Sequence, residues 1–386
     1  MNQTRIPILD LKPQYESIKD EIHIAVNNVL ESGQFIMGPD VKLFEQEVSN
    51  YLGVKHAIAV NSGTDALVIG LRALGIGLGD EVITTPFSFF ATAESISNVG
   101  AKPIFVDIDP QTFNINPELI EASITPQTKA IMPVHLYGNP AAMAKILAIA
   151  SKHNLKIIED CAQSFGAKYC STCCQNDCPE EIRSAISAKH TGTIGNVGAY
   201  SFFPSKNLGA YGDGGLIVTN NDQTAEIARM LRVHGAKKKY HNELLGYNSR
   251  LDTIQAAILR VKLKHIDSWN QKRRKVAQLY NQLLIDTQEI ITPTLAGGHV
   301  FHQYTIRVLD GKRDQLKQHL ADQSISSMIY YPTPQDKLPV YQGQYPDYPV
   351  SNKLGSEVLS LPIWPELRTD TIKYIVEQIK HYYING

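Results

Sequence analysis

The stretch HAIAVNSGTDALVIGLRALG, residues 56–75, joins a short apolar run to a segment with helical periodicity. Its first five residues predict a buried strand, and residues 64–74 predict a helix that follows directly. The pattern then repeats, with β-rich runs at 80–85, 102–107, 129–135 and 155–160 and helical segments at about 90–99, 116–123 and 140–153. Strands that alternate with helices indicate an α/β fold whose central sheet is mostly parallel and flanked by helices. Ligands of such sheets bind beyond the carboxyl ends of the strands, so functional residues are expected there.

The segments on either side of this core complete the predicted fold. Before it, the chain predicts a helix that stops at Gly33 and a second helix over 40–51. After it, the predicted elements are a strand in GGLIVTN, helices at about 222–234 and 252–285, a strand over 304–309, a helix over 313–322, a second strand in ISSMIYY (325–331) and two closing helices. We therefore expect a large domain, residues 1–250, and a smaller C-terminal α+β domain, residues 251–386, that begins with a long linking helix.

The composition excludes several classes of protein. The 386 residues include 43% hydrophobic side chains, which is typical of a globular chain and argues against wholesale disorder. The 37 basic and 38 acidic side chains balance, so no global field would recruit nucleic acid or a membrane surface. The N-terminus has no apolar core of signal-peptide length, and no run approaches a membrane span. We expect a soluble, cytoplasmic protein.

Two of the predicted strands end in polar residues that suit a ligand. Ser62 and Thr64 follow the first strand, where a helix N-terminus offers free amides to a phosphate, although serine and threonine also favour this position as caps. Asp160 ends the fifth strand and could pair with a cationic ring nitrogen, and Gln163 could reach the same ligand. A turn or cap explains an aspartate there equally well.

The third candidate is Lys206, in the stretch SFFPSKNLGAYGDGG at 201–215. A partly desolvated lysine amine can form a Schiff base with an aldehyde, and Ser201 could add a hydroxyl to a phosphate site. The glycines that follow would let backbone approach a bulky bound group, although the same residues would also form a simple turn beside a solvated lysine. Lysine, carboxylate and phosphate-holding amides together are the partners that pyridoxal 5′-phosphate needs, and a carboxylate at the ring nitrogen makes the ring an electron sink.

These motifs resemble the DegT/DnrJ/EryC1 family of sugar aminotransferases, which have the aspartate-aminotransferase (fold type I) architecture. The resemblance runs along nearly the whole chain, through PILDLKPQY, NSGTDAL, TPFSFFATAE, VHLYGNP, EDCAQSFGA, SFFPSKNLGAYGDGG, GYNSRLDTIQAAIL and IYYPTP. It implies that Lys206 carries the Schiff base, that Asp160 pairs with the pyridine nitrogen and that Gln163 lies near the phenolic oxygen of the cofactor.

The resemblance also implies roles for residues that the patterns alone do not single out. Gly63 and Thr64 match the phosphate loop, Ser201 the phosphate-contacting serine, and Phe89 the aromatic side chain that stacks on the cofactor ring. Asn248 matches an asparagine that reaches the cofactor phosphate of the neighbouring subunit, which implies a homodimer with shared active sites. The remaining positions match the substrate pocket (Arg250, His302 and Tyr331) or fit a structural role equally well (His135 and Arg232).

The chain departs from the family pattern in an insertion at about 170–190, which contains CSTCCQNDC. Cys170, Cys173 and Cys178, with Cys174 as an alternative ligand, could bind zinc as thiolates. The spacing lacks the second, distant pair of ligands of a zinc ribbon, which favours a loop with free thiols. We therefore expect no metal, and the insertion could border the substrate pocket.

The resemblance implies a ping-pong transamination in which L-glutamate donates the amino group and a nucleotide-linked keto-sugar receives it. The motifs are most similar to members that aminate C-3 of a UDP- or dTDP-linked sugar, such as a 3-keto UDP-N-acetylglucosaminuronate, for lipopolysaccharide O-antigen, other surface glycans or natural products. Amination at C-4 stays open. A sugar dehydratase of the same fold is disfavoured because such relatives carry histidine at the position of Lys206. A non-catalytic binding or regulatory protein is disfavoured by the intact set Asp160, Gln163, Ser201 and Lys206.

Overall fold

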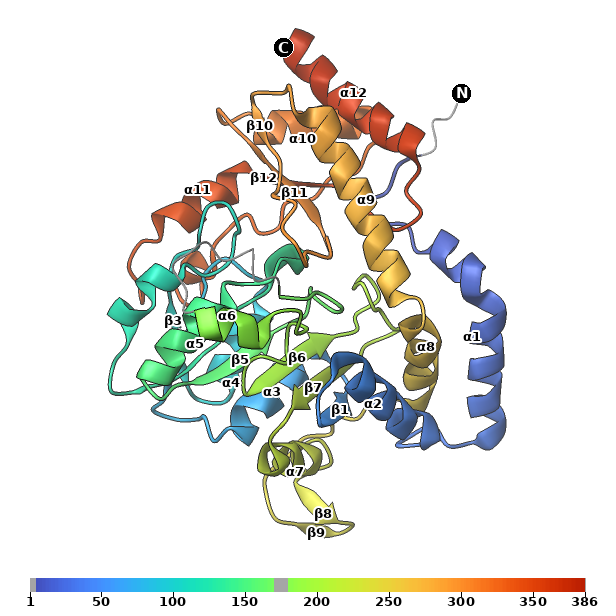
Figure 1. Ribbon diagram of the computed structural model, residues 1–386, viewed down its shortest axis with the longest axis vertical. Helices are drawn as coiled ribbons and strands as arrows, with labels where there is room; N and C mark the ends of the chain where they lie inside the picture. The colour runs from blue at the N-terminus through green and yellow to red at the C-terminus, as the bar shows by residue number, and fades with distance from the viewer. Residues whose placement is uncertain (1–4, 170–179, 386) are drawn as a thin grey trace.

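The computed structural model describes residues 5–169 and 180–385, which form a large α/β unit and a smaller unit around a second sheet (Figure 1). No helix among the described residues is long and apolar enough to cross a membrane. The helices are α1 (Lys12–Ser32), α2 (Pro39–Leu52), α3 (Gly63–Ala73), α4 (Ala91–Asn98), α5 (Met143–Lys152), α6 (Glu180–Ile186), α7 (Asp222–Leu231), α8 (Thr253–Leu263), α9 (Ile266–Leu284), α10 (Arg313–Asp322), α11 (Pro349–Glu357) and α12 (Thr369–Asn385).

The central sheet has seven strands in the order β1-β7-β6-β5-β4-β2-β3. All run parallel except β7, which is antiparallel to both of its neighbours, β1 and β6. This arrangement confirms the predicted fold class. The strands are β1 (His56–Val60), β2 (Glu81–Thr84), β3 (Lys102–Phe105), β4 (Thr128–Ile131), β5 (Lys156–Asp160), β6 (Val197–Ser201) and β7 (Gly215–Thr219).

Alternate residues of the same strand enter two different cores, because successive side chains of a strand point to opposite faces of the sheet. In β1, Ala57 and Ala59 pack with α1, α2 and α8 on one face, whereas Ile58 and Val60 pack with α3 and α7 on the other. Burial on both faces accounts for the nearly continuous apolar runs of these strands. The helices therefore fix the sheet from both sides and leave the carboxyl ends of its strands for a site.

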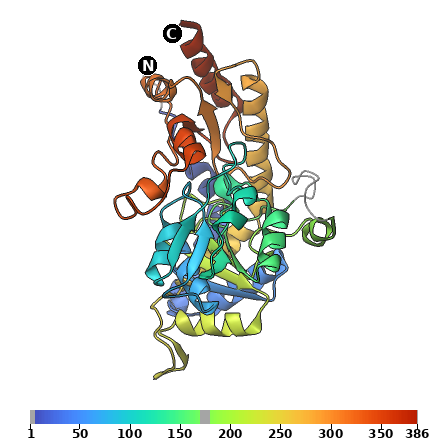
Figure 2. The ribbon, with the colours of Figure 1, turned by 90° about the vertical axis from the view of Figure 1, so that its left-hand side faces the viewer.

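The smaller unit is a three-stranded antiparallel sheet, β10 (Ile290–Ile291), β11 (Tyr304–Val308) and β12 (Val358–Leu361), with α9, α10 and α12 packed on it. It lies at one end of the molecule, and α7 lies at the other with the hairpin of β8 (Ala236–Lys238) and β9 (His241–Asn242) (Figures 1 and 2). The N-terminal segment also joins this unit, since Ile6 bridges to Ile325 and packs against its core. The boundary between residues 250 and 251 stays a prediction.

Three local predictions were wrong. The stretch 325–331 is not a strand: it makes only isolated bridges at Ile325 and Met328, and the third strand of the small sheet is β12. The expected helix at 116–123 is two short 3-10 turns. The helical stretch 252–285 divides into α8 and α9, because α8 packs in the core of the large unit whereas most of α9 packs on the small sheet.

Candidate active site

A cavity of about 470 Å³ lies beyond the carboxyl ends of the strands. Its walls come from the ends of β1, β5 and β6, from the start of α4 and from the segments at 302–303 and 330–331. The structure brings ten of the predicted site residues together around this cavity: Ser62, Gly63, Thr64, Phe89, Asp160, Gln163, Ser201, Lys206, His302 and Tyr331.

The turn between β1 and α3 forms one wall of the cavity. Ser62 is the N-cap of α3, and its hydroxyl accepts the backbone N–H of Asp65 at 3.1 Å. The capping interpretation of Ser62 is therefore confirmed, and the helix start it caps still directs backbone amides into the cavity. A Cβ atom on Gly63 would lie 2.6 Å from Cβ of Ser201, so only glycine lets the end of β6 approach this turn so closely.

The glycines after Lys206 have a different use from the predicted one. A Cβ atom on Gly215 would lie 2.1 Å from the carbonyl oxygen of Ser62, and one on Gly209 would lie 2.4 Å from that of Pro204. The close approach at both positions is to protein backbone. Gly209 lets the turn that carries Lys206 close on itself, and Gly215 lets the end of this turn pack against the start of α3.

Asp160 is the last residue of β5 and is buried, at 4% exposure. Its Oδ2 accepts the hydroxyl of Thr92 at 2.8 Å, and its Oδ1 accepts the backbone N–H of Ala162 at 3.1 Å. Burial raises the pKa of Asp160, and these two hydrogen bonds and the charge of Lys206 oppose that rise. The turn at Ala162 agrees with the capping interpretation, but the burial and the cavity position are also those of a ligand-holding carboxylate.

Lys206 lies on the turn between β6 and β7, whose first hydrogen bond runs from the N–H of Lys206 to the carbonyl of Phe203 at 2.8 Å. Desolvation lowers the pKa of Lys206 from 10.5 to about 8, although the negative charge of Asp160 opposes the change. A substantial fraction of the amine is therefore neutral near pH 7.5, the state in which it attacks an aldehyde. Lys206 is half-buried in the wall of the cavity, so it is not a fully solvated surface lysine.

Gln163 fixes the neighbouring hydroxyl of Tyr331. Its Oε1 accepts the backbone N–H of Tyr137 at 2.6 Å, so its Nε2 must be the atom that donates to the Tyr331 hydroxyl at 3.0 Å. His302 is buried, and its pKa lies well below its ordinary value because of that burial. Its Nδ1 donates to Oδ1 of Asn207 at 3.1 Å, because the amide nitrogen of Asn207 is itself a donor elsewhere. The cavity thus holds a neutral imidazole.

Asn248 and Arg250 do not line this cavity. Asn248 is exposed beside Val233, to which it bridges, so a contact with a cofactor in this cavity of the same chain is not made. Arg232 lies outside the cavity as well and pairs with Glu45 and the carbonyl of Ala59. Its role in a single chain is structural.

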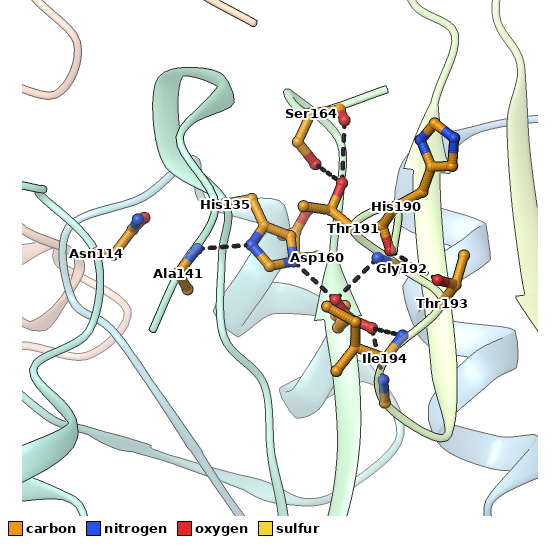
Figure 3. Close-up of polar contacts among 12 residues, drawn as sticks. Asn114, His135, Ala141, Asp160, Ser164, His190, Thr191, Gly192, Thr193 and Ile194 are labelled. Carbon is orange, nitrogen blue, oxygen red and sulfur yellow. Dashed lines mark hydrogen bonds and ion pairs between the residues drawn. The ribbon is translucent and has the colours of Figure 1, made fainter. Parts of the chain in front are cut away.

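His135 is part of a buried polar cluster that lies next to Asp160 (Figure 3). Its Nε2 donates to Glu159 at 3.0 Å, and its Nδ1 accepts the N–H of Ala141 at 3.0 Å. Glu159 also accepts three backbone N–H groups, from Gly192, Ile194 and Gly195, at 2.6 to 2.8 Å. His135, Glu159 and Cys161 are close enough to share a metal ion, but the carboxylate oxygens already have N–H partners, so the cluster fixes the loop after the insertion.

Cys170, Cys173, Cys174 and Cys178 lie outside the described residues. The described part of the insertion forms α6 and returns to the fold where Lys168 bridges to His190. Sequence reasoning also missed several residues that line the cavity. Ser88 and Thr92 lie in the stretch TPFSFFATAE, where only their position after a strand could have indicated them. The others are Leu67, Ala91, Val134, Ala162, Phe203, Ser205, Asp213, Gln303 and Tyr330.

Comparisons with known proteins agree with this geometry. Residues 16–380 match the model of the DegT/DnrJ/EryC1/StrS aminotransferase family. A "pleiotropic regulatory protein" of Geobacillus stearothermophilus is 49% identical over 98% of both chains. A UDP-N-acetyl-3-dehydro-alpha-D-glucosamine 3-aminotransferase of Acidithiobacillus ferrooxidans is 44% identical over 98% of both chains. DesV of S. venezuelae, whose crystal structure is in complex with a ketimine intermediate, superposes with a TM-score of 0.92 at 39% identity over 100% of both chains. The chain belongs to the DegT/DnrJ/EryC1/StrS aminotransferase family.

Proposed function

We propose that this protein is a pyridoxal phosphate-dependent aminotransferase that moves the amino group of L-glutamate to the keto carbon of a nucleotide-linked sugar. The observation that carries the proposal is the joint presence of Lys206, Asp160 and the Ser62–Thr64 helix start in one cavity. They are an amine of lowered pKa, a buried carboxylate and free backbone amides.

These groups fit the three reactive parts of the cofactor. Lys206 would hold the aldehyde covalently, Asp160 would accept the N–H of the ring nitrogen, and the amides at 63–64 with the Ser201 hydroxyl would hold the phosphate. Phe89, at 61% exposure, would cover the ring face, and Gln163 would lie at the phenolic oxygen. When bound, the cofactor supplies an electron sink for the pair left on the substrate carbon.

The chain itself would supply the proton transfer. When its amine is not bound to the cofactor, Lys206 would be free to take the proton from the substrate carbon with Nζ and to give it back. In the cofactor-free cavity the pKa of Lys206 is lowered to about 8, so the amine can release and regain a proton near neutral pH. Asp160 would hold a proton at the ring nitrogen of the bound cofactor.

The proposed acceptor is a ketone at C-3 of a UDP- or dTDP-linked sugar, and the whole-length similarity to a 3-aminotransferase supports that choice over C-4. His302 and Tyr331 would contact the substrate from the same chain. Asn248 and Arg250 would contribute from a second copy in a homodimer, since neither lines the cavity of its own chain. Nucleotide sugars and L-glutamate are metabolites of the cytoplasm, so we assign the reaction to that compartment.

A regulatory role is the second candidate, because one relative at 49% identity is called a pleiotropic regulatory protein. A binding module has no use for a buried carboxylate beside an amine of lowered pKa. The energetic cost of burying both groups favours the enzyme.

The test is the visible absorption spectrum of the purified protein with pyridoxal phosphate, before and after L-glutamate and then a nucleotide-linked 3-keto-sugar. We expect a yellow band that L-glutamate bleaches and the keto-sugar restores. Recovery with a 4-keto-sugar alone would move the reaction to C-4. A protein that stays colourless with added cofactor would favour the regulatory candidate.

A further inference from the structure

Three buried polar side chains form a chain of hydrogen bonds that ends on Asp160. The hydroxyls of Ser88 and Thr92 lie 2.9 Å apart, and the Thr92 hydroxyl lies 2.8 Å from Oδ2 of Asp160. Their exposed fractions are 4%, 1% and 4%. Ser88 and Thr92 come from the segment at the start of α4, whereas Asp160 ends β5, so the chain joins two separate walls of the cavity.

The direction of these hydrogen bonds follows from the charge of Asp160. An ionised carboxylate has only acceptor sites, so Thr92 must be the donor to Oδ2. The single hydroxyl proton of Thr92 is then used, and Ser88 must donate to the Thr92 oxygen. The backbone N–H of Ala162 donates to Oδ1 at 3.1 Å. Each carboxylate oxygen thus has one fixed donor and keeps a lone pair for a ligand.

Among the described residues, the hydroxyl of Thr92 bonds only to Ser88 and Asp160. The N-cap of α4 is Phe90, which provides no side-chain cap. The local contacts of Thr92 are made by its backbone, whose N–H donates to the Phe89 carbonyl at 3.1 Å and whose carbonyl accepts the Ser95 hydroxyl at 2.9 Å. A threonine on a helix has few χ1 rotamers available, so its hydroxyl is held in place. We propose that Thr92 is a positioning residue that orients Asp160 and keeps it ionised for the cofactor ring nitrogen, with Ser88 fixing the Thr92 hydroxyl.

This role answers a specific difficulty of the site. Burial favours the neutral carboxylic acid, and a neutral Asp160 would not retain a proton on the ring nitrogen. The groups whose charge favours an ionised Asp160 are Lys206 and His135, and the titratable side chains of Tyr331 and Cys161 also face Asp160. Lys206 has a pKa of about 8 and would be consumed by the bond to the cofactor, and His135 already donates to Glu159. Hydrogen bonds from neutral donors do not depend on the charge of Lys206 or His135. Asp160 accepts two such bonds, one from the Thr92 hydroxyl and one from the Ala162 N–H.

The inference rests on the proposed function for its purpose but can be tested without the cofactor. We would label the aspartate carboxyl carbons with ¹³C, assign the Asp160 signal from its loss in Asp160→Asn, and titrate the cofactor-free full-length protein by NMR. Thr92→Val keeps the shape of the side chain and removes the hydroxyl, so we expect the Asp160 titration midpoint to rise by about one pH unit or more. Thr92→Ser, the matched control, should stay within a few tenths of a unit of the wild type.

Ser88→Ala removes only the donor to Thr92, and we expect a smaller rise in the same direction. It keeps the test decisive should Thr92→Val not fold. An Asp160 midpoint that is unchanged in Thr92→Val, or in Ser88→Ala where that variant stands alone, overturns the proposal.

A second readout separates the positioning role from the proposed function. In protein loaded with pyridoxal phosphate, Thr92→Val should shift the pH at which the visible band changes and should lower kcat more than it raises KM, whereas Thr92→Ser should restore both. If wild-type protein binds no cofactor, the proposed function fails while the NMR titration still decides the role of Thr92. If the cofactor binds and the NMR midpoint does not move, only the role of Thr92 fails.

Discussion

Replacing Asp160 with asparagine should make Lys206 a better nucleophile in the cofactor-free protein although it damages turnover. Desolvation lowers the pKa of Lys206 from 10.5 to about 8, and the negative charge of Asp160 is the one influence that opposes this change. Asp160→Asn removes that charge while it keeps the volume of the side chain. The pKa of Lys206 should therefore fall below about 8.

The size of the effect follows from the fraction of neutral amine. At pH 7.5 an amine with a pKa of 10.5 is neutral in about one molecule in a thousand, and one with a pKa of about 8 in about a quarter of the molecules. Asp160→Asn should increase the neutral fraction of Lys206 further, at most about fourfold at pH 7.5 and more at pH 6.5. The gain should vanish above pH 9, where the amine is neutral in both proteins.

The assay is reductive methylation with formaldehyde and a borohydride reagent across pH 6 to 11, with the label on each lysine measured by mass spectrometry. Exposed lysines such as Lys102 and Lys373 report how the reagent itself depends on pH. We expect a labelling midpoint near pH 8 for Lys206 and a lower one in Asp160→Asn. A wild-type midpoint at or above pH 10, or an upward shift in the variant, would refute the electrostatic account of this site.

Three further predictions concern stability. Gly215→Ala should lower the free energy of unfolding by several kcal/mol and weaken cofactor binding, because the added Cβ would lie 2.1 Å from the Ser62 carbonyl oxygen. The matched control is Gly77→Ala, whose added Cβ would lie 3.5 Å from its nearest neighbour, and equal urea midpoints for the two variants would contradict this prediction. Lys206→Met should stabilise the cofactor-free protein by at most about 3 kcal/mol below pH 8, because the folded state then no longer carries a desolvated charge. This gain in stability should disappear as the pH rises toward 10.5, and thermal melts at pH 7 and pH 10 test the difference. Glu159→Gln should lower the melting temperature, because its amide nitrogen would face N–H donors and reduce the free energy of unfolding by about 2 kcal/mol or more. An unchanged melting temperature would show that the hydrogen bonds of Glu159 do not stabilise the fold.

The parts of the fold that could be predicted from sequence are those with a local signal. The runs at 56–60 and 155–160 form strands because their side chains are buried on both faces of the sheet, and that burial requires apolar residues at successive positions. Ser62, Asp160 and Lys206 could be predicted to line one cavity because each lies at the carboxyl end of a strand or a few residues after it, and the carboxyl ends of parallel strands meet at one edge.

The parts that could not be predicted depend on contacts between distant segments. The stretch 325–331 has the composition of a strand, but Tyr330 and Tyr331 face the cavity and leave the pairing in the small sheet to β12. Gly215 is explained by Ser62, a residue far from it in the sequence. The hydrogen bond between Thr92 and Asp160 likewise joins residues 68 positions apart, and no local pattern indicates it.

We propose that Lys206 holds the cofactor in the cavity that Asp160 and the Ser62–Thr64 helix start complete. The most direct test of this proposal is to load the protein with pyridoxal phosphate, reduce it with sodium borohydride and locate the modified lysine by peptide mass spectrometry. We expect Lys206 alone to carry the reduced cofactor, and we expect prior treatment with L-glutamate to abolish the label. A label on another lysine, or no stable label on protein that has bound the cofactor, would contradict it.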